Sequence, residues 1–374
     1  MIYLDNGATT PLDGDVLEAM LPYLKENYGN AQSQHGAGRA SANALISARD
    51  KVAELLGCRA DEVYFVSSGT EAGNTALKGV CLNRGKGRIV ISSIEHPALY
   101  ESALDMQKLG FEVTFVDPDK NGVVSAKSVE SALTDDTVFC AVMSANNETG
   151  VIQPVEEIAK VCRERGIFYY TDSVQTAGCC ALPTATVDGL GISAHKFYGP
   201  KGVGALYIKN GSKFSRLISG GMQERGLRGG TSNVAGAVGL AYALEKAVKE
   251  RQKNNAHVKT VRDGFLDRVL KEIPCAKLNG CKDLLLPGHA NVTFDGCDGE
   301  NILFMLDLKG VCVSTGSACS AGAVAPSRSL ISMGLGEREA KSAVRFTFGK
   351  YNTREEADLV VEELKKAVNI IKRT

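Results

Sequence analysis

Short apolar runs alternate with amphipathic segments between about residue 60 and residue 210. Runs of strand length are Val63–Ser67, Arg88–Ser92, Glu112–Val116, Val138–Ser144, Ile167–Thr171, Gly189–Ser193 and Ala205–Lys209. Helical spacing is found between several of them, over Thr70–Leu82, Pro97–Leu109 and Pro154–Arg165. Strands that alternate with helices predict an α/β fold with a mostly parallel sheet covered on both faces. Ligands of such sheets bind beyond the C-terminal ends of the strands, so the loops there are the places to look for chemistry.

The C-terminal part of the chain has a different pattern. A long helical stretch follows Asn233 and reaches about Ile273, with one predicted break. Two further strands, Ala290–Phe294 and Ala343–Phe348, are mixed with helices, and the last helix opens with Thr353 and Glu356 at capping-box spacing. A chain of 374 residues is long for one core, so we expect two domains joined by the long helix.

Composition narrows the class of protein. Hydrophobic residues make up 44% and charged residues 23%, as in ordinary globular chains. The 43 basic residues balance the 43 acidic ones, and this argues against a direct nucleic-acid binder. The N-terminus has no signal-peptide pattern, and no apolar run is long enough to cross a bilayer. We therefore expect a cytoplasmic protein with no membrane contact.

The chain has eleven cysteines but no CxxC pair, so we expect no metal site. In a cytoplasmic chain most of them, including the adjacent Cys179 and Cys180, should be reduced, buried and inert.

A turn that could bind phosphate follows the first of the predicted strands. Gly69 allows close approach of a ligand, Thr70 adds a hydroxyl, and the helix that begins there offers free N–H groups. An ordinary strand-to-helix turn explains the same residues equally well. The segment matches neither a P-loop nor GxGxxG.

Two other strand ends carry polar side chains. Asp172 could pair with a protonated ring nitrogen and Gln175 could bind a ring substituent, although Asp172 could equally be a helix or turn cap. In Ser193-Ala-His195-Lys196, a lysine directly after a strand is well placed to be a desolvated amine that forms a Schiff base with an aldehyde cofactor. Lys201 competes with it, but its Pro-Lys-Gly setting indicates an exposed turn.

Three more residues could take part in catalysis or ligand binding. His96 could stack on an aromatic cofactor and move protons, or could simply cap a helix. Cys319 lies in a run of small residues typical of an exposed loop, unlike the other cysteines. Arg345 is a lone charge in an apolar strand and needs an anionic partner, either a substrate carboxylate or a structural one. The loops around Asn147 and Thr231 are polar but have little specificity alone.

Each of these features is weak evidence when it is taken alone. Together, and in this order along the chain, they are specific for one protein family. From Tyr3-Leu-Asp-Asn-Gly-Ala-Thr-Thr-Pro11 to Arg345-Phe, the chain closely resembles the NifS/IscS-like cysteine desulfurases of the class V aminotransferase group. The resemblance implies the fold-type I architecture of pyridoxal-phosphate (PLP) enzymes. We expect a large PLP-binding domain over residues 13–255 with a seven-stranded sheet. Residues 1–12 and 256–374 should form a smaller α+β domain that carries Cys319 and Arg345.

The resemblance also implies roles for the candidate residues. Lys196 would bind PLP covalently, Asp172 would pair with its ring nitrogen, and His96 would stack on the ring and transfer protons. Other cofactor contacts would come from Gly69, Thr70, Ser193 and His195 at the phosphate, from Gln175 and Asn147 near the ring oxygen, and from Thr231 of the second subunit of a homodimer. The substrate would be bound by Asn30, His35, Asn147 and Arg345. Cys319 would accept the sulfur.

The implied reaction converts L-cysteine to L-alanine and leaves a persulfide on Cys319. A sulfur-acceptor protein, either an iron–sulfur scaffold or a tRNA-thiolation enzyme, would then receive the sulfur. Selenocysteine lyase, another PLP-dependent transferase and a non-catalytic partner protein are the alternatives.

Three departures from the family pattern stand out. The loop Gly29–His35 differs from the usual Gly-Asn-Pro-Ser-Ser-x-His, and Gly69 and Arg328 stand where alanine and histidine or tyrosine are common.

Overall fold

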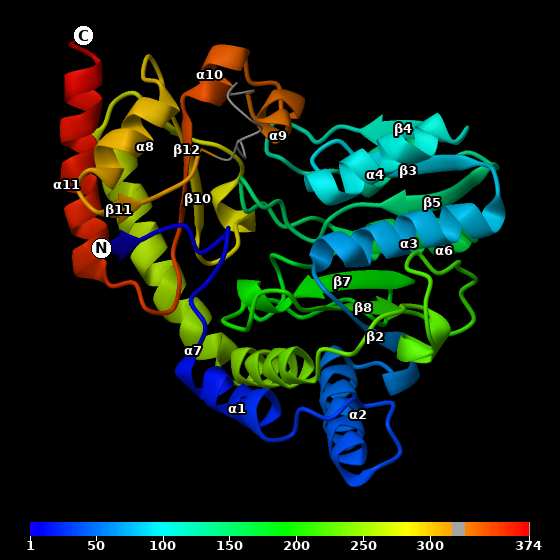
Figure 1. The fold of residues 1–374 in the computed structure, drawn as a ribbon. Helices are drawn as coiled ribbons and strands as arrows, with labels where there is room; N and C mark the ends of the chain where they lie inside the picture. The colour runs from blue at the N-terminus through cyan, green and yellow to red at the C-terminus, as the bar shows by residue number, and fades with distance from the viewer. Residues whose placement is uncertain (316–325, 374) are drawn as a thin grey trace.

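The computed structural model describes residues 1–315 and 326–373. Its centre is a seven-stranded sheet of order β2-β8-β7-β6-β5-β3-β4 (Figure 1). The strands are β2 (Val63–Val66), β3 (Arg88–Ser92), β4 (Glu112–Val116), β5 (Thr137–Ala141), β6 (Phe168–Asp172), β7 (Gly189–Ser193) and β8 (Gly204–Ile208). Within this sheet β8 runs in the opposite direction to the other six strands. The predicted α/β fold is confirmed, with strand ends displaced by at most three residues.

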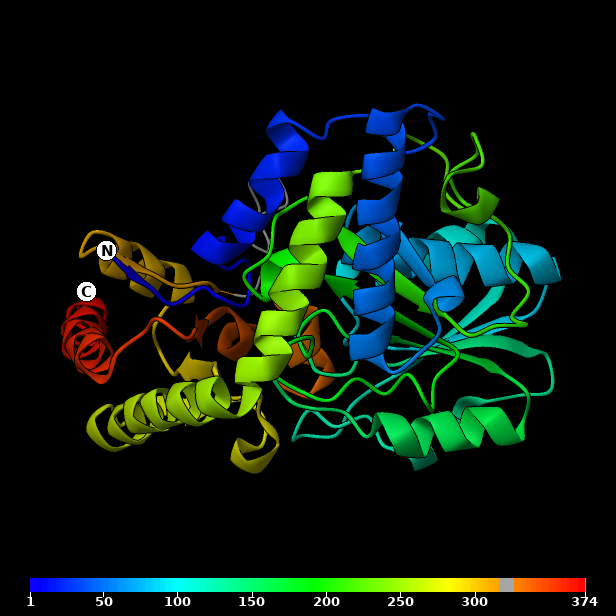
Figure 2. The ribbon, with the colours of Figure 1, turned by 90° about the horizontal axis from the view of Figure 1, so that it is seen from below.

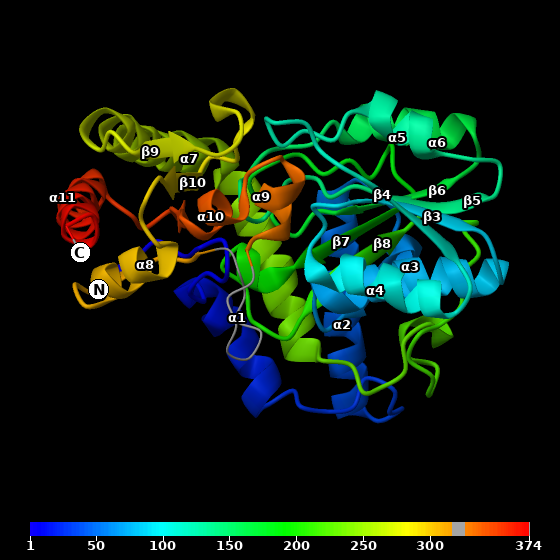
Figure 3. The ribbon, with the colours of Figure 1, turned by 90° about the horizontal axis from the view of Figure 1, so that it is seen from above.

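Helices cover both faces of this sheet, because alternate strand side chains point to opposite sides. Ile89 and Ile91 pack with α3 (Gly69–Arg84) and α4 (Pro97–Lys108). Val90 between them packs into the core on the other face. That face is covered by α1 (Gly14–Lys25), α2 (Gly36–Leu56), α5 (Ala126–Ala132), α6 (Val155–Glu164) and the first half of α7 (Val234–Glu272). Figure 3 shows α5 and α6 on one side of the sheet, and α3 and α4 on the other.

The long helix α7 is continuous from Val234 to Glu272, so the prediction of a break in it is wrong. The helix instead changes direction about half-way (Figures 1 and 2). Its buried residues stop at Leu244 and resume at Val258. The polar stretch between them suggested a break, but a solvated bend satisfies the same pattern.

The second half of α7 packs into a separate core. This core contains β10 (His289–Phe294), β12 (Ala343–Thr347), α8 (Gly299–Asp307) and α11 (Arg354–Ile371). The smaller elements of this region are β9 (Ala276–Leu278), β11 (Val311–Cys312), α9 (Arg328–Ser332) and α10 (Glu337–Lys341). The N-terminus reaches this core too, since β1 (Ile2–Tyr3) pairs with β11 and Leu4 is fully buried there. The predicted capping box of Thr353 and Glu356 at the start of α11 is present.

Among the described cysteines none is in a disulfide, but only Cys81, Cys140, Cys162 and Cys297 are buried. The other six are half-buried, so the expectation that most would be buried was wrong. The described residues contain neither a helix that could cross a membrane nor a cluster of side chains suited to a metal ion.

Candidate active site

The candidate residues gather where the parallel strands end. Because β2, β3, β5, β6 and β7 run in the same direction, the loops that follow them meet at one edge of the sheet. Asp172 is the last residue of β6 and Ser193 the last of β7. The N-terminal segment crosses this edge, since Thr10 donates to the carbonyl of His195.

Lys196 reaches this N-terminal segment with its amine. Its Nζ lies 2.6 Å from the carbonyl oxygen of Gly7 and 2.9 Å from that of Ala8. Burial and the nearby guanidinium of Arg345 lower the pKa of Lys196 to about 8, against the opposing effect of Asp172. Lys201 is exposed in its turn. Lys196 therefore has the desolvated amine that a covalent cofactor needs.

Asp172 is a buried carboxylate at the C-terminal end of β6. Its side chain is 7% exposed and accepts one hydrogen bond, from the amide of Val174. Within residues 1–315 and 326–373 it has no ion-pair partner. Burial raises its pKa to about 6. A buried carboxylate of this kind can be compensated by a protonated ring nitrogen.

The surroundings of two histidines, His96 and His195, lower their pKa values and so favour neutral rings. His96 caps α4, where its Nδ1 accepts from the amide of Ala98 at 3.1 Å, so the capping alternative is present. Surrounding protein and the charges of Lys196 and Arg328 lower its pKa to about 4, although the residue still reaches solvent. His195 contacts the hydroxyl of Thr9, and burial lowers its pKa to about 4 as well. Neutral imidazoles can stack on a flat ring or accept a proton.

The turn that was predicted to bind phosphate is formed by the start of α3. Ser68 caps this helix by accepting from the amide of Glu71, while Thr70 is exposed. A Cβ at Gly69 would lie 2.5 Å from Cγ2 of Val174. Glycine is therefore required here by its neighbour, which explains why alanine is absent from this position.

We expect Gly69→Ala to destabilise the protein by about 1–3 kcal/mol, because the added methyl group overlaps Val174. Thermal unfolding measures this. The double variant with Val174→Ala should recover most of the loss, and a double variant no more stable than Gly69→Ala would contradict the steric account.

Arg345 has a carboxylate partner within the protein, which was the alternative to a substrate carboxylate. One Nη donates to Asp5 at 2.7 Å and the other to the carbonyl of Asn147 at 2.9 Å, while its buried Nε has no partner in the described structure. The backbone of Arg345 also pairs with Ser314. The Nε–H thus stays open to an anion, while Asp5 already neutralises part of the charge of the guanidinium.

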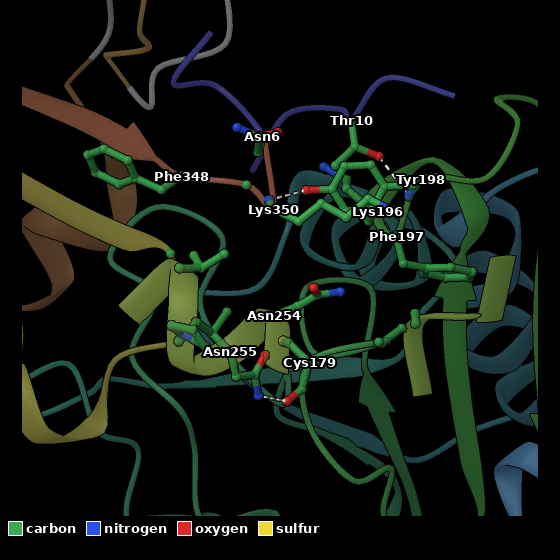
Figure 4. Close-up of a pocket in the computed structure, with 18 of the residues that line it drawn as sticks. Asn6, Thr10, Cys179, Lys196, Phe197, Tyr198, Asn254, Asn255, Phe348 and Lys350 are labelled. Carbon is green, nitrogen blue, oxygen red and sulfur yellow. Dashed lines mark hydrogen bonds between the residues drawn. The ribbon is translucent and has the colours of Figure 1, made fainter. Parts of the chain in front are cut away.

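Gln175 is bound to the N-terminal segment. Its amide donates to the carbonyl of Gly7, the same oxygen that Lys196 contacts. A cavity of about 130 Å³ adjoins this region (Figure 4) and includes Lys196, Asn254 and Lys350 in its lining. Of the other candidate residues, Gln175 also lines this cavity, whereas Asp172 and His96 do not.

Three predicted residues have other surroundings. Asn30 and His35 are exposed and make turn and cap hydrogen bonds at the start of α2. Their loop lies away from β12 in Figures 1 and 2. Thr231 is also exposed, in the loop before α7. This loop contacts the Asn30–His35 loop through a hydrogen bond of 2.6 Å between Gln223 and Gln32.

Cys319 falls outside the described residues. The described residues that precede and follow the 316–325 segment both contact the candidate site. Ser314 pairs with Arg345, and Ser327 donates to the carboxylate of Glu148. Sequence reasoning missed Asp5 and Glu148 as site residues, since no local pattern reveals a carboxylate whose partner is hundreds of positions away.

The aminotransferase class-V family model matches residues 2–360 of this chain. Cysteine desulfurase IscS of Dictyoglomus turgidum is 44% identical over 98% of this chain and 94% of the relative. The corresponding protein of Clostridium botulinum (strain Hall) is 42% identical with the same coverage. The chain belongs to the cysteine desulfurases of the class-V aminotransferase family.

Solved structures agree with this assignment. A NifS-like protein covers all of this desulfurase and is itself fully covered, with a TM-score of 0.92 and 36% identity. A structure titled SspA in complex with cysteine has a TM-score of 0.83 and 32% identity, over 94% of this chain and all of the other. The resemblance and the fold-type I assignment made from the sequence are thus confirmed, and PLP is the cofactor of this family. The buried carboxylate of Asp172 without a cation and the desolvated Lys196 fit that group.

Proposed function

We propose that this desulfurase transfers the sulfur of L-cysteine to Cys319 and releases L-alanine. The observation that carries the proposal is the meeting, at one sheet edge, of Lys196, Asp172 and Arg345 with the chain on both sides of residues 316–325. Bound PLP supplies an electron sink that acidifies the α-carbon of the amino acid and weakens its carbon–sulfur bond. All other work belongs to side chains of the protein.

We assign to Lys196 the removal of the proton from the α-carbon of the substrate. With a pKa of about 8, a substantial fraction of its amine is neutral near neutral pH and can bind the cofactor covalently or accept a proton. Asp172 would hold the proton of the ring nitrogen, and His96 would lie against the ring. Ser193, His195, Gly69 and Thr70 would bind the phosphate, and Gln175 and Asn147 would contact the ring oxygen or its vicinity.

Arg345 would bind the substrate carboxylate, with Asn147 beside it. Its unpartnered Nε is available for this contact, while Asp5 and the carbonyl of Asn147 each accept from one Nη and hold the guanidinium in place. The thiolate of Cys319 would then attack the substrate sulfur. A sulfur–sulfur bond forms as the carbon–sulfur bond breaks, and the electron pair of the broken bond stays with the carbon fragment that becomes alanine.

The homodimer and the domain division belong to the proposal as well. Asn30, His35 and Thr231 are exposed on two loops joined through Gln32 and Gln223, beside Tyr28, which is 79% exposed. A second copy that covers this surface would receive these three residues at its own site. Two separate cores support a large domain of residues 13–255 and a small domain of residues 1–12 and 256–374.

We further propose a cytoplasmic location and an acceptor protein for the persulfide, either an iron–sulfur scaffold or a tRNA-thiolation enzyme. The unpaired state of the cysteines in the described residues supports a reducing compartment.

The experiment is alanine formation from L-cysteine by PLP-loaded protein with reductant present. Cys319→Ala should lower the rate by at least about 10²-fold, because no other nucleophile takes the sulfur. Cys312→Ala, seven positions earlier, is the matched control and should retain activity. Equal rates for wild type and Cys319→Ala would exclude the persulfide route.

A further inference from the structure

The start of α9 is fastened to the loop between β3 and α4. Nε of Arg328 donates to the carbonyl of Ser93 at 2.9 Å, and an Nη donates to the carbonyl of Glu95 at 2.5 Å. The guanidinium also lies over the ring of Tyr100, 3.6 Å from its centroid. Figures 1 and 3 show α9 beside the edge at which β3 ends.

These contacts flank His96 in the sequence, although His96 itself is exposed. Glu95 directly precedes it, and Tyr100 lies one helical turn after it on α4. Tyr100 is itself held by stacking on Phe115, with ring centroids 4.6 Å apart. Arg328 therefore holds the His96 backbone on one side and the first turn of its helix on the other.

The same segment is tied to the loop after β5. The two carboxylate oxygens of Glu148 accept from the hydroxyls of Ser327 and Ser329. The amide of Asn146 donates to the carbonyl of Ile94 at 3.0 Å and contacts the hydroxyl of Ser329 at 3.3 Å. One network thus joins the His96 loop, the Asn147 loop and the chain that follows residues 316–325.

Arg328 makes these contacts without a carboxylate within ion-pair distance in the described residues. Two carbonyls and an aromatic face require a planar cation with several donors in fixed directions, which lysine lacks. Its positive charge also acts on His96 and helps to lower the pKa of that imidazole.

We propose that Arg328 is a positioning residue for His96. It sets the place of the imidazole for the desulfurase reaction from the segment that follows Cys319. Its charge adds to the effects of burial and Lys196, which favour the neutral ring. This inference rests on the role of His96 in the proposed function.

The test compares Arg328→Gln with Arg354→Gln, an exposed arginine at the start of α11 that serves as control. In PLP-free protein, NMR titration of the five histidines, with His96 assigned from His96→Gln, should show the pKa of His96 raised in Arg328→Gln and unchanged in the control. Arg328→Lys should leave this pKa low, because the charge remains. An unchanged His96 pKa in Arg328→Gln would overturn the electrostatic part of the proposal.

Kinetics of the PLP-loaded enzyme test positioning. We expect both Arg328→Gln and Arg328→Lys to lower kcat for alanine formation about 10-fold with little change in KM. In a His96→Gln background, Arg328→Gln should have almost no further effect. Tyr100→Leu, which removes only the stacking partner, should lower kcat in the same direction if Arg328→Gln proves unstable in thermal unfolding.

The outcomes separate the two claims. If His96→Gln keeps full activity, the proposed function of His96 fails. If His96→Gln loses activity while Arg328→Gln and Tyr100→Leu keep it, or if the losses of His96→Gln and Arg328→Gln simply multiply, only the positioning role of Arg328 fails.

Discussion

Lys196→Ala is expected to lower alanine formation from L-cysteine by at least about 10³-fold, because it removes the residue proposed both to bind PLP covalently and to act as the base at the α-carbon. The lowered pKa of about 8 and the burial of this amine at the sheet edge are the reasons for choosing it. The purified variant should also lose the absorption band of covalently bound PLP, which is read without any turnover.

Lys201→Ala is the matched control, five positions further along the chain. Lys201 is exposed, so its removal should leave both the absorption band and the rate within about 2-fold of wild type. A larger loss in Lys201→Ala than in Lys196→Ala would reverse the assignment of the two lysines.

Asp172→Asn should separate stability from activity. Activity should fall by about 10²-fold or more, since a neutral amide cannot hold the proton of the ring nitrogen. The PLP-free protein should nevertheless become more stable at pH 7.5, by about 1–2 kcal/mol, because the variant no longer buries an uncompensated carboxylate.

The sign follows from the raised pKa of Asp172, about 6 against an ordinary value of 3.8. Folded protein binds a proton at this site more tightly than unfolded protein does. The contribution of Asp172 to stability is therefore fully present below pH 3.8 and is lost as pH rises through 6. Thermal unfolding of both PLP-free proteins at pH 5 and 7.5 measures this, and the advantage of the variant should shrink at pH 5. An advantage that grows at pH 5 would contradict the burial argument.

The sequence predicted the sheet well because most residues of its strands, apart from the edge strand β4, are buried and read as apolar runs. Arg88–Ser92 and Gly189–Ser193 agree with the structure at both ends. Asp172 and Lys196 were found for a related reason, since a charged residue that ends an apolar strand is conspicuous. The bend of α7 was read as a break, because a solvated stretch without a buried face looks the same in either case.

Contacts between distant segments were beyond local reasoning. Asp5 was not predicted as the partner of Arg345, which is 340 positions away. The bracing of His96 by Arg328 likewise depends on a contact across 233 positions to Glu95. Gly69 was singled out for its approach to a ligand, whereas the structure adds a requirement set by Val174. Such pairings arise only when the sheet edge and the second core are brought together.

The central claim is that the sulfur of L-cysteine becomes covalently bound to Cys319. The most direct measurement is mass spectrometry of the PLP-loaded protein after brief exposure to L-cysteine without reductant, followed by digestion with trypsin. The fragment of residues 310–328 contains both Cys312 and Cys319, so its fragmentation spectrum must locate the added sulfur. We predict one additional sulfur atom on Cys319 and none on Cys312, with none on either in Lys196→Ala. Sulfur on Cys312 alone, or alanine release with no sulfur on this fragment, would contradict the account.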